Sequence, residues 1–299
     1  MNDSTDRFRT RRAFDRAAPG FTKADFLHTE IRDRLLHRLS MIQIEPDWII
    51  DLGAAIGVGA RALAELFPES HIVGLDWSAD MLSEFNSAPA EKVKSQGETS
   101  ITAISPVCAD AYCLPIHDRS VDLVFSNLLL QNCQNPFAVL NEARRILNYP
   151  GVFLFTTLGP DSLQELRQAW RDTDRYSHIS EFIDMHDLGD ALIQAGFVEP
   201  VMTRESLRIT YPSLVPAIAD LRTVGSINAT IERNRGLTSR QAWVRLTDAY
   251  EDFRDAEGKL PVTVEVIYGL AWSGQRPDTR LPDGEFEIPV NELKPFRRM

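Results

Sequence analysis

The segment 51–59, which reads Asp-Leu-Gly-Ala-Ala-Ile-Gly-Val-Gly, constrains the fold of this chain more than any other feature of its sequence. It follows a short apolar run at residues 48–52 and opens a helical pattern over residues 60–67. Glycine in a strand-to-helix turn lets the backbone bend sharply and approach a ligand, which then faces the free N–H groups of the helix. A turn of this kind predicts an α/β sheet with a ligand site at the turn.

Strand and helix patterns alternate along the chain around this turn. Apolar runs predict strands over residues 48–52, 71–76, 101–108, 121–126, 151–157, 198–211 and 262–268. Helical spacing of apolar residues predicts helices over 26–39, 60–67, 78–85, 136–147, 161–170, 187–195, 213–224 and 239–254. The alternation of apolar strands with helices is typical of a mostly parallel sheet that helices cover on both faces.

The same patterns suggest how the chain is divided. We expect a helical lid over residues 1–45 and a sheet domain over residues 46–272, with a helical insertion at about 212–258. Residues 273–299 contain four prolines and little periodicity, so we expect a loosely ordered tail there.

Polar side chains stand at the ends of successive predicted strands. Asp51 closes the first strand, Asp76 the second and Asn127 the fourth, while Asp110 directly follows the third. The carboxyl ends of parallel strands meet at one edge of a sheet, where open α/β sheets bind their ligands. A carboxylate at the end of the second strand can accept hydrogen bonds from both hydroxyls of a ribose. Together these residues predict a nucleoside site.

The spacing of the glycines limits which ligands this turn can bind. Gly53, Gly57 and Gly59 do not match the G-x-G-x-x-G fingerprint of dinucleotide-binding turns, and the chain has no G-x-x-x-x-G-K-[ST] phosphate loop. A ligand that carries adenosine without phosphates fits this spacing better. The sequence therefore predicts S-adenosyl-L-methionine as the cofactor.

Composition excludes several other classes of protein. The net charge of −11 argues against a general nucleic-acid surface. The longest strongly apolar runs are about eight residues, far below the roughly 20 that a membrane span needs. The first twenty residues mix arginine with aspartate and contain no apolar stretch, so we expect a cytoplasmic protein without a secretory signal. Cys108, Cys113 and Cys133 lack the paired spacing of a metal site, and we expect them to be small buried side chains.

Several stretches resemble known proteins. Residues 51–57 resemble the D-L-G-x-G-x-G motif of class I methyltransferases, and later motifs of that class are similar to residues 74–76, 110–115 and 122–127. Longer stretches resemble the biotin-pathway malonyl-[acyl-carrier protein] O-methyltransferases, namely residues 14–20, 126–131, 156–167, 178–182 and 268–272. This resemblance implies a Rossmann-like fold, with a mostly parallel seven-stranded sheet, helices on both faces and a helical cap. It also implies methylation of the free carboxylate of malonyl-[acyl-carrier protein], with S-adenosyl-L-methionine as methyl donor, in biotin synthesis.

The resemblance and the strand-end positions together imply a set of cofactor-binding residues. These are Phe21, His28, Asp51, Gly53, Ala54, Gly57, Asp76, Trp77, Asp110, Ala111, Asn127 and Leu128. The glycines would let the backbone approach the methionine and ribose, Asp76 would bind the ribose hydroxyls and Trp77 would pack on adenine. Asp110 would accept a hydrogen bond from the adenine amino group, with the N–H of Ala111 beside it. We expect Phe21 and His28 to close the lid over the cofactor, and no metal to be required.

Candidates on the substrate side are fewer. His178 is expected to act as a neutral donor to a carboxylate or a thioester carbonyl, although a helix-capping or surface role explains a histidine there equally well. Arg167 could pair with the malonyl carboxylate or, alternatively, with Glu165 in a solvated ion pair. The segment Arg204–Arg245 holds seven arginines against three acidic residues, a local balance of +4. We expect this segment to be helical and to receive an acidic acyl carrier protein; the alternative is an ordinary solvated helical face.

Departures from the family pattern leave other functions open. The family's Cys-Gly-Thr is Ala54-Ala55-Ile56 here, and a positive φ at Ala55 would cost about 1 kcal/mol or more. Phe21, His28 and Asn132 stand where the family has tyrosine, glutamine and tryptophan. Residues 22–31 and 178–182 also resemble methyltransferase-like arginine hydroxylases that assist assembly of respiratory complex I. A hydroxylase or a non-catalytic assembly factor is therefore the alternative to methyl transfer.

Overall fold

The structure is a computed structural model of the whole chain, and it describes residues 6–87, 104–171, 173–174, 176–225, 228, 233 and 236–274. Its strands are β1 (Trp48–Leu52), β2 (His71–Asp76), β3 (Ile104–Cys108), β4 (Val121–Asn127), β5 (Leu147–Leu158), β6 (Phe197–Tyr211) and β7 (Leu260–Ser273). Its helices are α1 (Arg7–Ala17), α2 (Phe26–Leu39), α3 (Val58–Leu66), α4 (Ala79–Ser87), α5 (Pro136–Ile146), α6 (Gln164–Arg171), α7 (Met185–Gln194), α8 (Leu214–Thr223) and α9 (Arg240–Glu251), with the 3-10 turns η1 (Ala18–Lys23) and η2 (Leu130–Asn132).

All seven strands form one sheet in the order β3-β2-β1-β4-β5-β7-β6. The first five strands are parallel to one another, whereas β7 pairs antiparallel with both β5 and β6. The strand order reverses beside β1, so the carboxyl ends of β1, β2 and β4 surround a crevice in which such sheets bind ligands. The predicted seven-stranded, mostly parallel sheet is confirmed.

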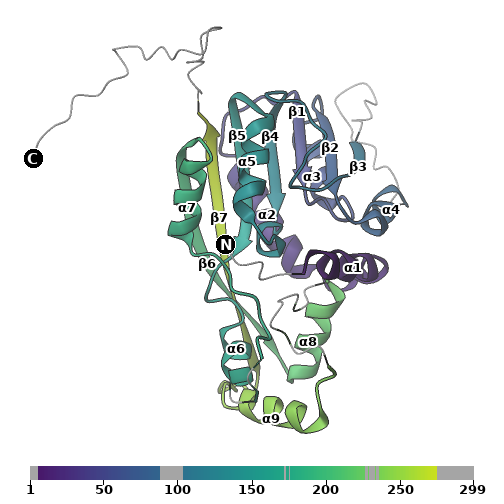
Figure 1. Ribbon diagram of the computed structural model, residues 1–299, viewed down its shortest axis with the longest axis vertical. Helices are drawn as coiled ribbons and strands as arrows, with labels where there is room; N and C mark the ends of the chain where they lie inside the picture. The colour runs from purple at the N-terminus through teal and green to yellow at the C-terminus, as the bar shows by residue number, and fades with distance from the viewer. Residues whose placement is uncertain are drawn as a thin grey trace, which may run out of the picture.

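Successive residues of the central strands enter two separate cores because side chains alternate across a sheet. Ile49 of β1 packs in one core with Leu35 of α2 and Leu63 of α3. Ile50 packs in the other core with Leu140 of α5 and Leu192 of α7. Helices therefore cover both faces, and Figure 1 shows them on either side of the sheet. The two cores fix the positions of the strand ends that carry the polar residues.

The long strands β6 and β7 extend beyond the rest of the sheet into a lower lobe that also holds α6, α8 and α9 (Figure 1). Leu166 of α6, Leu214 of α8 and Leu246 of α9 share one buried cluster in this lobe. The hydroxyl of Tyr250 donates to the carbonyl of Pro261 at 2.7 Å, which fastens α9 to β7. Helices α8 and α9 lie within the segment expected to be an insertion.

Some elements differ from the sequence-based expectations. Helix α1, which is rich in arginine, falls within the expected helical lid over residues 1–45, although no separate helix was predicted over residues 7–17; it lies across the carboxyl edge of the sheet (Figure 1). Residues 88–103, between α4 and β3, and all but the first two residues of the predicted tail at 273–299 lie outside the described residues. In the described part of the chain, no helix is long and apolar enough to cross a membrane.

Candidate active site

A cavity opens at the carboxyl edge of the sheet, between the ends of β1, β2 and β4 and the segment η1–α2. We call it the first cavity. It is lined by eleven of the twelve residues expected to bind the cofactor: Phe21, His28, Asp51, Gly53, Ala54, Asp76, Trp77, Asp110, Ala111, Asn127 and Leu128. The structure thus brings together in one cavity residues that are more than 100 positions apart in the sequence.

Gly57 is the expected residue that does not line the first cavity. It precedes α3 with φ +76°, a conformation that favours glycine. A Cβ atom at this position would also overlap the ring of Phe85 from α4. Both observations give Gly57 a role in the turn and in packing α4 against it, rather than in facing a ligand.

The loop between β1 and α3 has left-handed backbone at two further positions, Gly53 with φ +82° and Ala55 with φ +47°. The N–H groups of Gly53 and Ala54 both donate to the carbonyl of Leu75, at 2.8 and 3.0 Å, which binds the loop to β2. Ala55 therefore adopts the positive φ that the family's glycine accommodates freely. An L-residue in this region costs about 1–2 kcal/mol relative to ordinary backbone.

Asp76 connects this loop to the start of α4. Its Oδ2 accepts the N–H of Ala55 at 2.9 Å and its Oδ1 accepts the N–H of Ser78 at 2.8 Å. Burial raises the pKa of Asp76, while these backbone donors act in the opposite direction. Each carboxylate oxygen has a second lone pair, so Asp76 can hold the loop and still accept hydrogen bonds from a ligand in the cavity.

Asp51 is a buried carboxyl group, 3 % exposed, at the inner end of the first cavity. Its Oδ2 has no hydrogen-bond partner among the described residues. Burial, reinforced by the charge of Asp76, raises the pKa of Asp51 to about 7. A buried carboxylate with one unpartnered oxygen is stabilised by a cation. The site therefore fits a ligand that carries positive charge as well as ribose hydroxyls.

Arg7 of α1 covers the outer end of the first cavity. Its Nη2 contacts Oδ2 of Asp110 at 2.5 Å, and its guanidinium lies 4.2 Å from the ring centre of Tyr112 and 5.6 Å from that of Trp77. The sequence did not reveal this residue, because the expected lid over residues 1–45 specified no contact and this contact joins residues 103 positions apart. Arg7 thus meets Asp110 and Trp77, the two residues expected to contact adenine.

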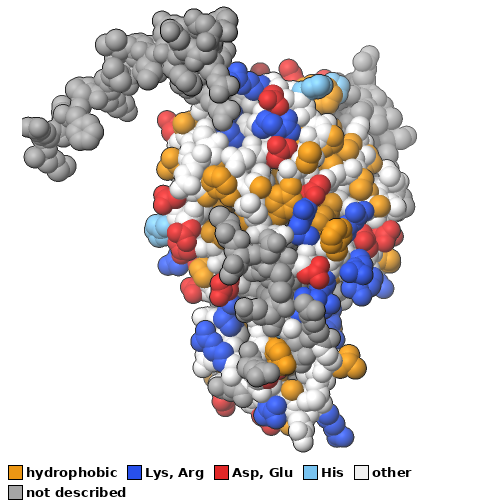
Figure 2. Space-filling view, in the orientation of Figure 1, with side chains coloured by type: hydrophobic (Ala, Val, Ile, Leu, Met, Phe, Trp, Pro, Cys, Tyr) orange, Lys and Arg blue, Asp and Glu red, His pale blue; other side chains and the backbone are white. Residues whose placement is uncertain are grey.

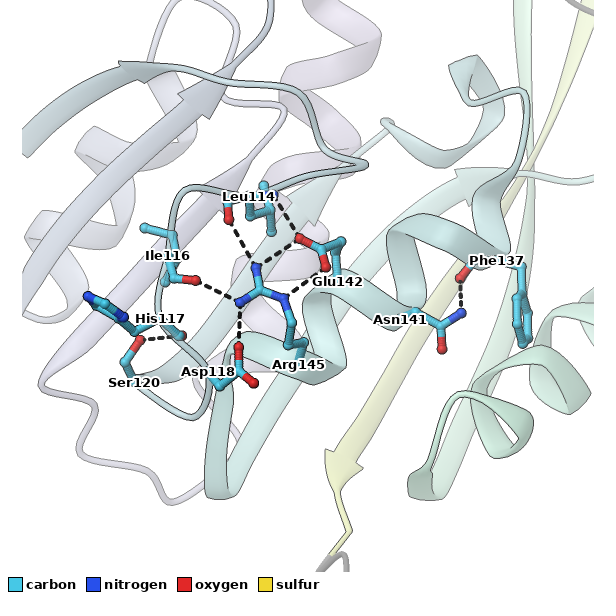
Figure 3. A network of polar contacts seen from close by, with 9 residues as sticks. All are labelled: Leu114, Ile116, His117, Asp118, Ser120, Phe137, Asn141, Glu142 and Arg145. Atoms are coloured by element: carbon cyan, nitrogen blue, oxygen red, sulfur yellow. Dashed lines mark hydrogen bonds and ion pairs between the residues drawn. The ribbon is translucent and has the colours of Figure 1, made fainter.

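The segment that follows Asp110 is held in place from α5, as Figure 3 shows. The guanidinium of Arg145 donates to the carbonyls of Leu114 and Ile116, at 2.9 and 2.8 Å, and to Asp118 at 2.7 Å. Glu142 accepts hydrogen bonds from Arg145 and also takes the N–H of Leu114 at 2.7 Å. These contacts fix the backbone beyond the strand end that carries Asp110 and Ala111.

The lid over the first cavity consists of η1 and the start of α2. The rings of Phe21 and His28 lie 5.2 Å apart, and both line the cavity. Asn127 of β4 donates from Nδ2 to the carbonyl of His28 at 3.0 Å, and its Oδ1 accepts from Thr156 at 2.8 Å. Asn127 therefore ties the lid to the sheet. Burial, with a contribution from the charge of Arg32, lowers the pKa of His28 to about 4, so the imidazole is neutral at pH 7.

A second cavity adjoins the first and extends into the lower lobe. Its volume is about 380 Å³, and His28, Leu128 and Asn132 line both cavities. Arg9, Arg222 and Arg233 also line the second cavity. The two cavities together can hold a cofactor and an acceptor on either side of these three shared residues.

His178, one of the two substrate-side candidates, lines the second cavity. Its ring stacks on that of Trp170 with 3.5 Å between centroids, and its Nε2 lies 2.8 Å from Oδ1 of Asp174. Arg167 lines neither the first nor the second cavity. It points instead toward the backbone carbonyls of Ser162 and Ser180, at 3.4 Å, and so braces this part of the lower lobe.

The arginines of Arg204–Arg245 are not gathered on helices as expected. Arg204 and Arg208 belong to β6 and pair with Glu265 and Asp255, at 3.1 and 3.3 Å. The helical expectation for the start of this segment is therefore wrong, because residues 204–211 pair with β7. Arg222 and Arg233 do reach the second cavity, whereas Arg235 lies outside the described residues.

The cysteines also differ from expectation. Cys108 and Cys113 are exposed and Cys133 is half-buried, so the interpretation of these residues as small buried side chains is wrong for the first two. Cys108 ends the edge strand β3 and Cys113 follows it, at the edge of the sheet where no further strand pairs among the described residues. Within the described ranges, no group of three or more histidine, cysteine or acidic side chains is arranged to hold a metal ion.

Comparison with known proteins identifies the family. A family model described as a methyltransferase domain matches residues 50–155. The malonyl-[acyl-carrier protein] O-methyltransferase of Laribacter hongkongensis is 43% identical over 284 residues, which cover 94% of this chain and 94% of that protein. The protein of the same name from Gallionella capsiferriformans is 42% identical over 267 residues, 89% of this chain and 91% of that protein.

A solved structure, that of the YcgJ protein from Bacillus subtilis, is similar in fold alone. It has a TM-score of 0.55 and 14% sequence identity, and the match covers 81% of this chain and 98% of that one. The predicted class I methyltransferase fold and the use of S-adenosyl-L-methionine agree with these matches. The chain belongs to the malonyl-[acyl-carrier protein] O-methyltransferase family.

Proposed function

We propose that this chain transfers a methyl group from S-adenosyl-L-methionine to the free carboxylate of a malonyl group on an acyl carrier protein, a step of biotin synthesis. The observation that carries the proposal is the pair of adjoining cavities, which share His28, Leu128 and Asn132. The first has the strand-end carboxylates suited to a nucleoside. The second is larger and lined by arginines, as an anionic acceptor on a long arm requires. Family membership supports the same reaction.

The cofactor side follows from the groups that line the first cavity. Asp76 would accept hydrogen bonds from ribose hydroxyls, and Asp110 with the N–H of Ala111 would meet the adenine. The unpartnered Oδ2 of Asp51 would face the positive charge of the ligand. When bound, S-adenosyl-L-methionine supplies an electrophilic methyl group on a sulfonium centre. The residues of the chain bind and orient this group and keep water away from it.

The acceptor needs little chemical activation. A malonyl carboxylate is already ionised at pH 7, so no general base is required, and the chain has only to align the reacting atoms. Phe21 and Leu128, both buried, give the first cavity apolar walls. Low polarity favours a reaction in which the carboxylate loses its charge. The closed lid therefore serves both to exclude water and to favour the transfer.

The arginines around the second cavity support docking of an acidic carrier protein. Burial, and then the charges of Arg233, Arg16 and Arg12, lower the pKa of Arg9, which indicates a concentration of positive charge there. Figure 2 shows Lys and Arg side chains gathered beside α1 and on the lower lobe. We infer that the carrier approaches this side and that its malonyl arm enters the second cavity. Of the segment Arg204–Arg245, Arg222 and Arg233 are then the residues nearest to the arm.

The proposal is tested by titration with S-adenosyl-L-methionine and S-adenosyl-L-homocysteine, followed by mass spectrometry of malonyl-carrier protein. We expect saturable binding of both nucleosides and a mass gain equal to one methylene unit on the carrier. Acetyl-carrier protein, which lacks the free carboxylate, is the control and should keep its mass. Absence of binding at millimolar nucleoside would contradict the proposal. A gain of one oxygen atom on an arginine would instead support the hydroxylase alternative.

A further inference from the structure

Three residues, His28, Leu128 and Asn132, line both cavities, and we call them the neck. On the basis of the proposed function, the reacting carboxylate and methyl group must meet at the neck. We propose that the side-chain N–H groups of His28 and Asn132 hold the acceptor carboxylate there, and that these two residues select for acceptors with a free carboxylate.

The imidazole of His28 lacks a protein partner. Neither ring nitrogen forms a hydrogen bond with any described residue, and Nδ1 is shielded from solvent. Its ring packs against Phe21, and its backbone carbonyl is held by Asn127 at 3.0 Å. Buried polar groups in folded proteins are nearly always satisfied. A half-buried imidazole with a shielded Nδ1 and no hydrogen-bond partner among the described residues, at the wall of two cavities, is therefore suited to a polar ligand.

Asn132, the second donor residue of the neck, has one side-chain N–H that no described residue accepts. Its Nδ2 reaches the carbonyl of Leu128 at 3.3 Å, which uses one of the two amide hydrogens. Leu128 itself has φ +56°, and its N–H donates to Oγ1 of Thr156 at 3.0 Å. Strained backbone of this kind persists where the surrounding contacts hold it firmly. The turn therefore presents Asn132 to the neck in a fixed position.

None of the three neck residues is charged at pH 7, since burial keeps His28 in its uncharged form, which has one N–H donor. Arg32 lines the first cavity and its charge also lowers the pKa of His28, but it is not part of the neck. Arg9, Arg222 and Arg233 line the second cavity but not the first. A guanidinium against the carboxylate would stabilise its charge and make the oxygen a weaker nucleophile. Neutral donors orient the carboxylate without that penalty.

The reaction balances without any proton transfer at the neck. One carboxylate oxygen forms a bond to the methyl carbon, the bond between that carbon and sulfur breaks, and the electron pair remains on sulfur. The second carboxylate oxygen keeps its hydrogen bond throughout. His28 and Asn132 thus act by holding the acceptor and need not change their protonation state.

A conservative substitution supplies a matched variant. Glutamine also carries side-chain N–H donors, so His28→Gln preserves the proposed contact. Phenylalanine preserves the ring and its packing against Phe21 but removes the donor. Asn132→Leu likewise keeps the approximate size of its side chain and removes the amide.

The test is calorimetric titration of each variant, first saturated with S-adenosyl-L-homocysteine, with malonyl-coenzyme A and with acetyl-coenzyme A. We expect His28→Phe and Asn132→Leu each to weaken malonyl-coenzyme A binding about tenfold or more, since a donor to a charged group is lost. Acetyl-coenzyme A binding should change less than about threefold, and His28→Gln should resemble the wild type for both ligands. Turnover of malonyl-coenzyme A should fall in the same order.

Each of the other possible outcomes of this titration contradicts a specific part of the proposal. If both donor-removing variants bind malonyl-coenzyme A as the wild type does, the neck does not hold the carboxylate. If they lose malonyl- and acetyl-coenzyme A equally, or if His28→Gln fails with His28→Phe, the role is one of shape and the proposal is wrong. If the wild type binds S-adenosyl-L-homocysteine but methylates no carboxylate, the proposed function fails and this inference fails with it.

Discussion

The backbone N–H of Ala55 donates to Oδ2 of Asp76 at 2.9 Å, so the loop after β1 and the end of β2 form a single unit. Ala55 makes this contact with φ +47°, in a conformation that an L-residue adopts at some cost. The residue expected to bind ribose thus also fixes the strained position of the loop. Changes at either residue should alter the cofactor site, but in opposite directions.

Asp76→Asn should weaken the binding of S-adenosyl-L-homocysteine about tenfold or more, because a charged acceptor of ligand hydrogen bonds becomes a neutral amide. Asp122→Asn is the matched control. Asp122 also accepts backbone N–H groups, those of Asp47 and Trp48 at 3.0 Å, but at the opposite edge of the sheet. Calorimetric titration should find nucleoside affinity lost in the first variant only. Equal affinities in the two variants would remove Asp76 from the cofactor site.

Ala55→Gly should raise the free energy of unfolding by about 1 kcal/mol, because glycine adopts a positive φ without the steric penalty that alanine incurs. Nucleoside affinity should be unchanged or increased. The neighbouring variant Ala54→Gly is the control, since Ala54 is buried with ordinary φ and should lose stability. Urea denaturation of both variants measures the difference. A loss of stability at Ala55 similar to that at Ala54 would show that the loop is not strained.

Strand-end residues were predictable because parallel strands impose a common edge. Asp51, Asp76 and Asn127 could be assigned to one cavity from the position of each residue in its own strand, without knowledge of any contact. The same reasoning placed Gly57 against the ligand, whereas in the structure Gly57 serves the turn and packs against Phe85. Spacing alone does not distinguish a glycine that faces a ligand from one that makes room for a side chain.

Contacts between distant segments could not be predicted. Arg7 reaches Asp110 across 103 positions, from the arginine-rich helix α1. Arg167 belongs to a stretch that resembles the family, yet its side chain points to backbone carbonyls of the lower lobe. In both cases tertiary packing decides where the end of a long side chain lies, and the local sequence pattern does not indicate that position.

Stability should depend on pH through Asp51. Its folded pKa of about 7 lies above the ordinary value of 3.8, so the folded state holds a proton that the unfolded chain releases between these values. Wild-type stability should therefore fall as the pH rises from about 4 to 7, relative to Asp51→Asn, which has no such proton. At pH 8 the variant should be more stable by a few kcal/mol, and near pH 4 the difference should vanish. Urea denaturation across this pH range measures it.

Glu142 is the control of opposite sign. Its hydrogen bonds with Arg145 lower its pKa, so its contribution to stability is present above the ordinary pKa of 4.5 and is lost as the pH falls. Glu142→Gln should therefore be less stable than the wild type at pH 8, and the deficit should shrink toward low pH. If Asp51→Asn followed the same course as Glu142→Gln, the carboxyl group of Asp51 would not be protonated in the folded protein.

Reversal of charge at Arg222 tests where the carrier protein docks. Arg222 lines the second cavity, is exposed and forms no ion pair with the described residues, so Arg222→Glu breaks no ion pair among them. We expect transfer from malonyl-carrier protein to slow about tenfold at low salt, with the effect shrinking as salt is added, because like charges then repel the acidic carrier. Transfer from malonyl-pantetheine, which is small and has no phosphate, should be unaffected.

Arg240→Glu is the matched control for this experiment, because Arg240 lies in the same arginine-rich segment and is exposed, but lines neither cavity. The two variants carry the same change in net charge, so a general loss of attraction would slow both equally. Slower transfer from malonyl-pantetheine in Arg222→Glu would point to damage inside the cavity rather than at the docking surface. Only a defect specific to Arg222 and to the carrier-bound substrate supports docking at the mouth of the second cavity.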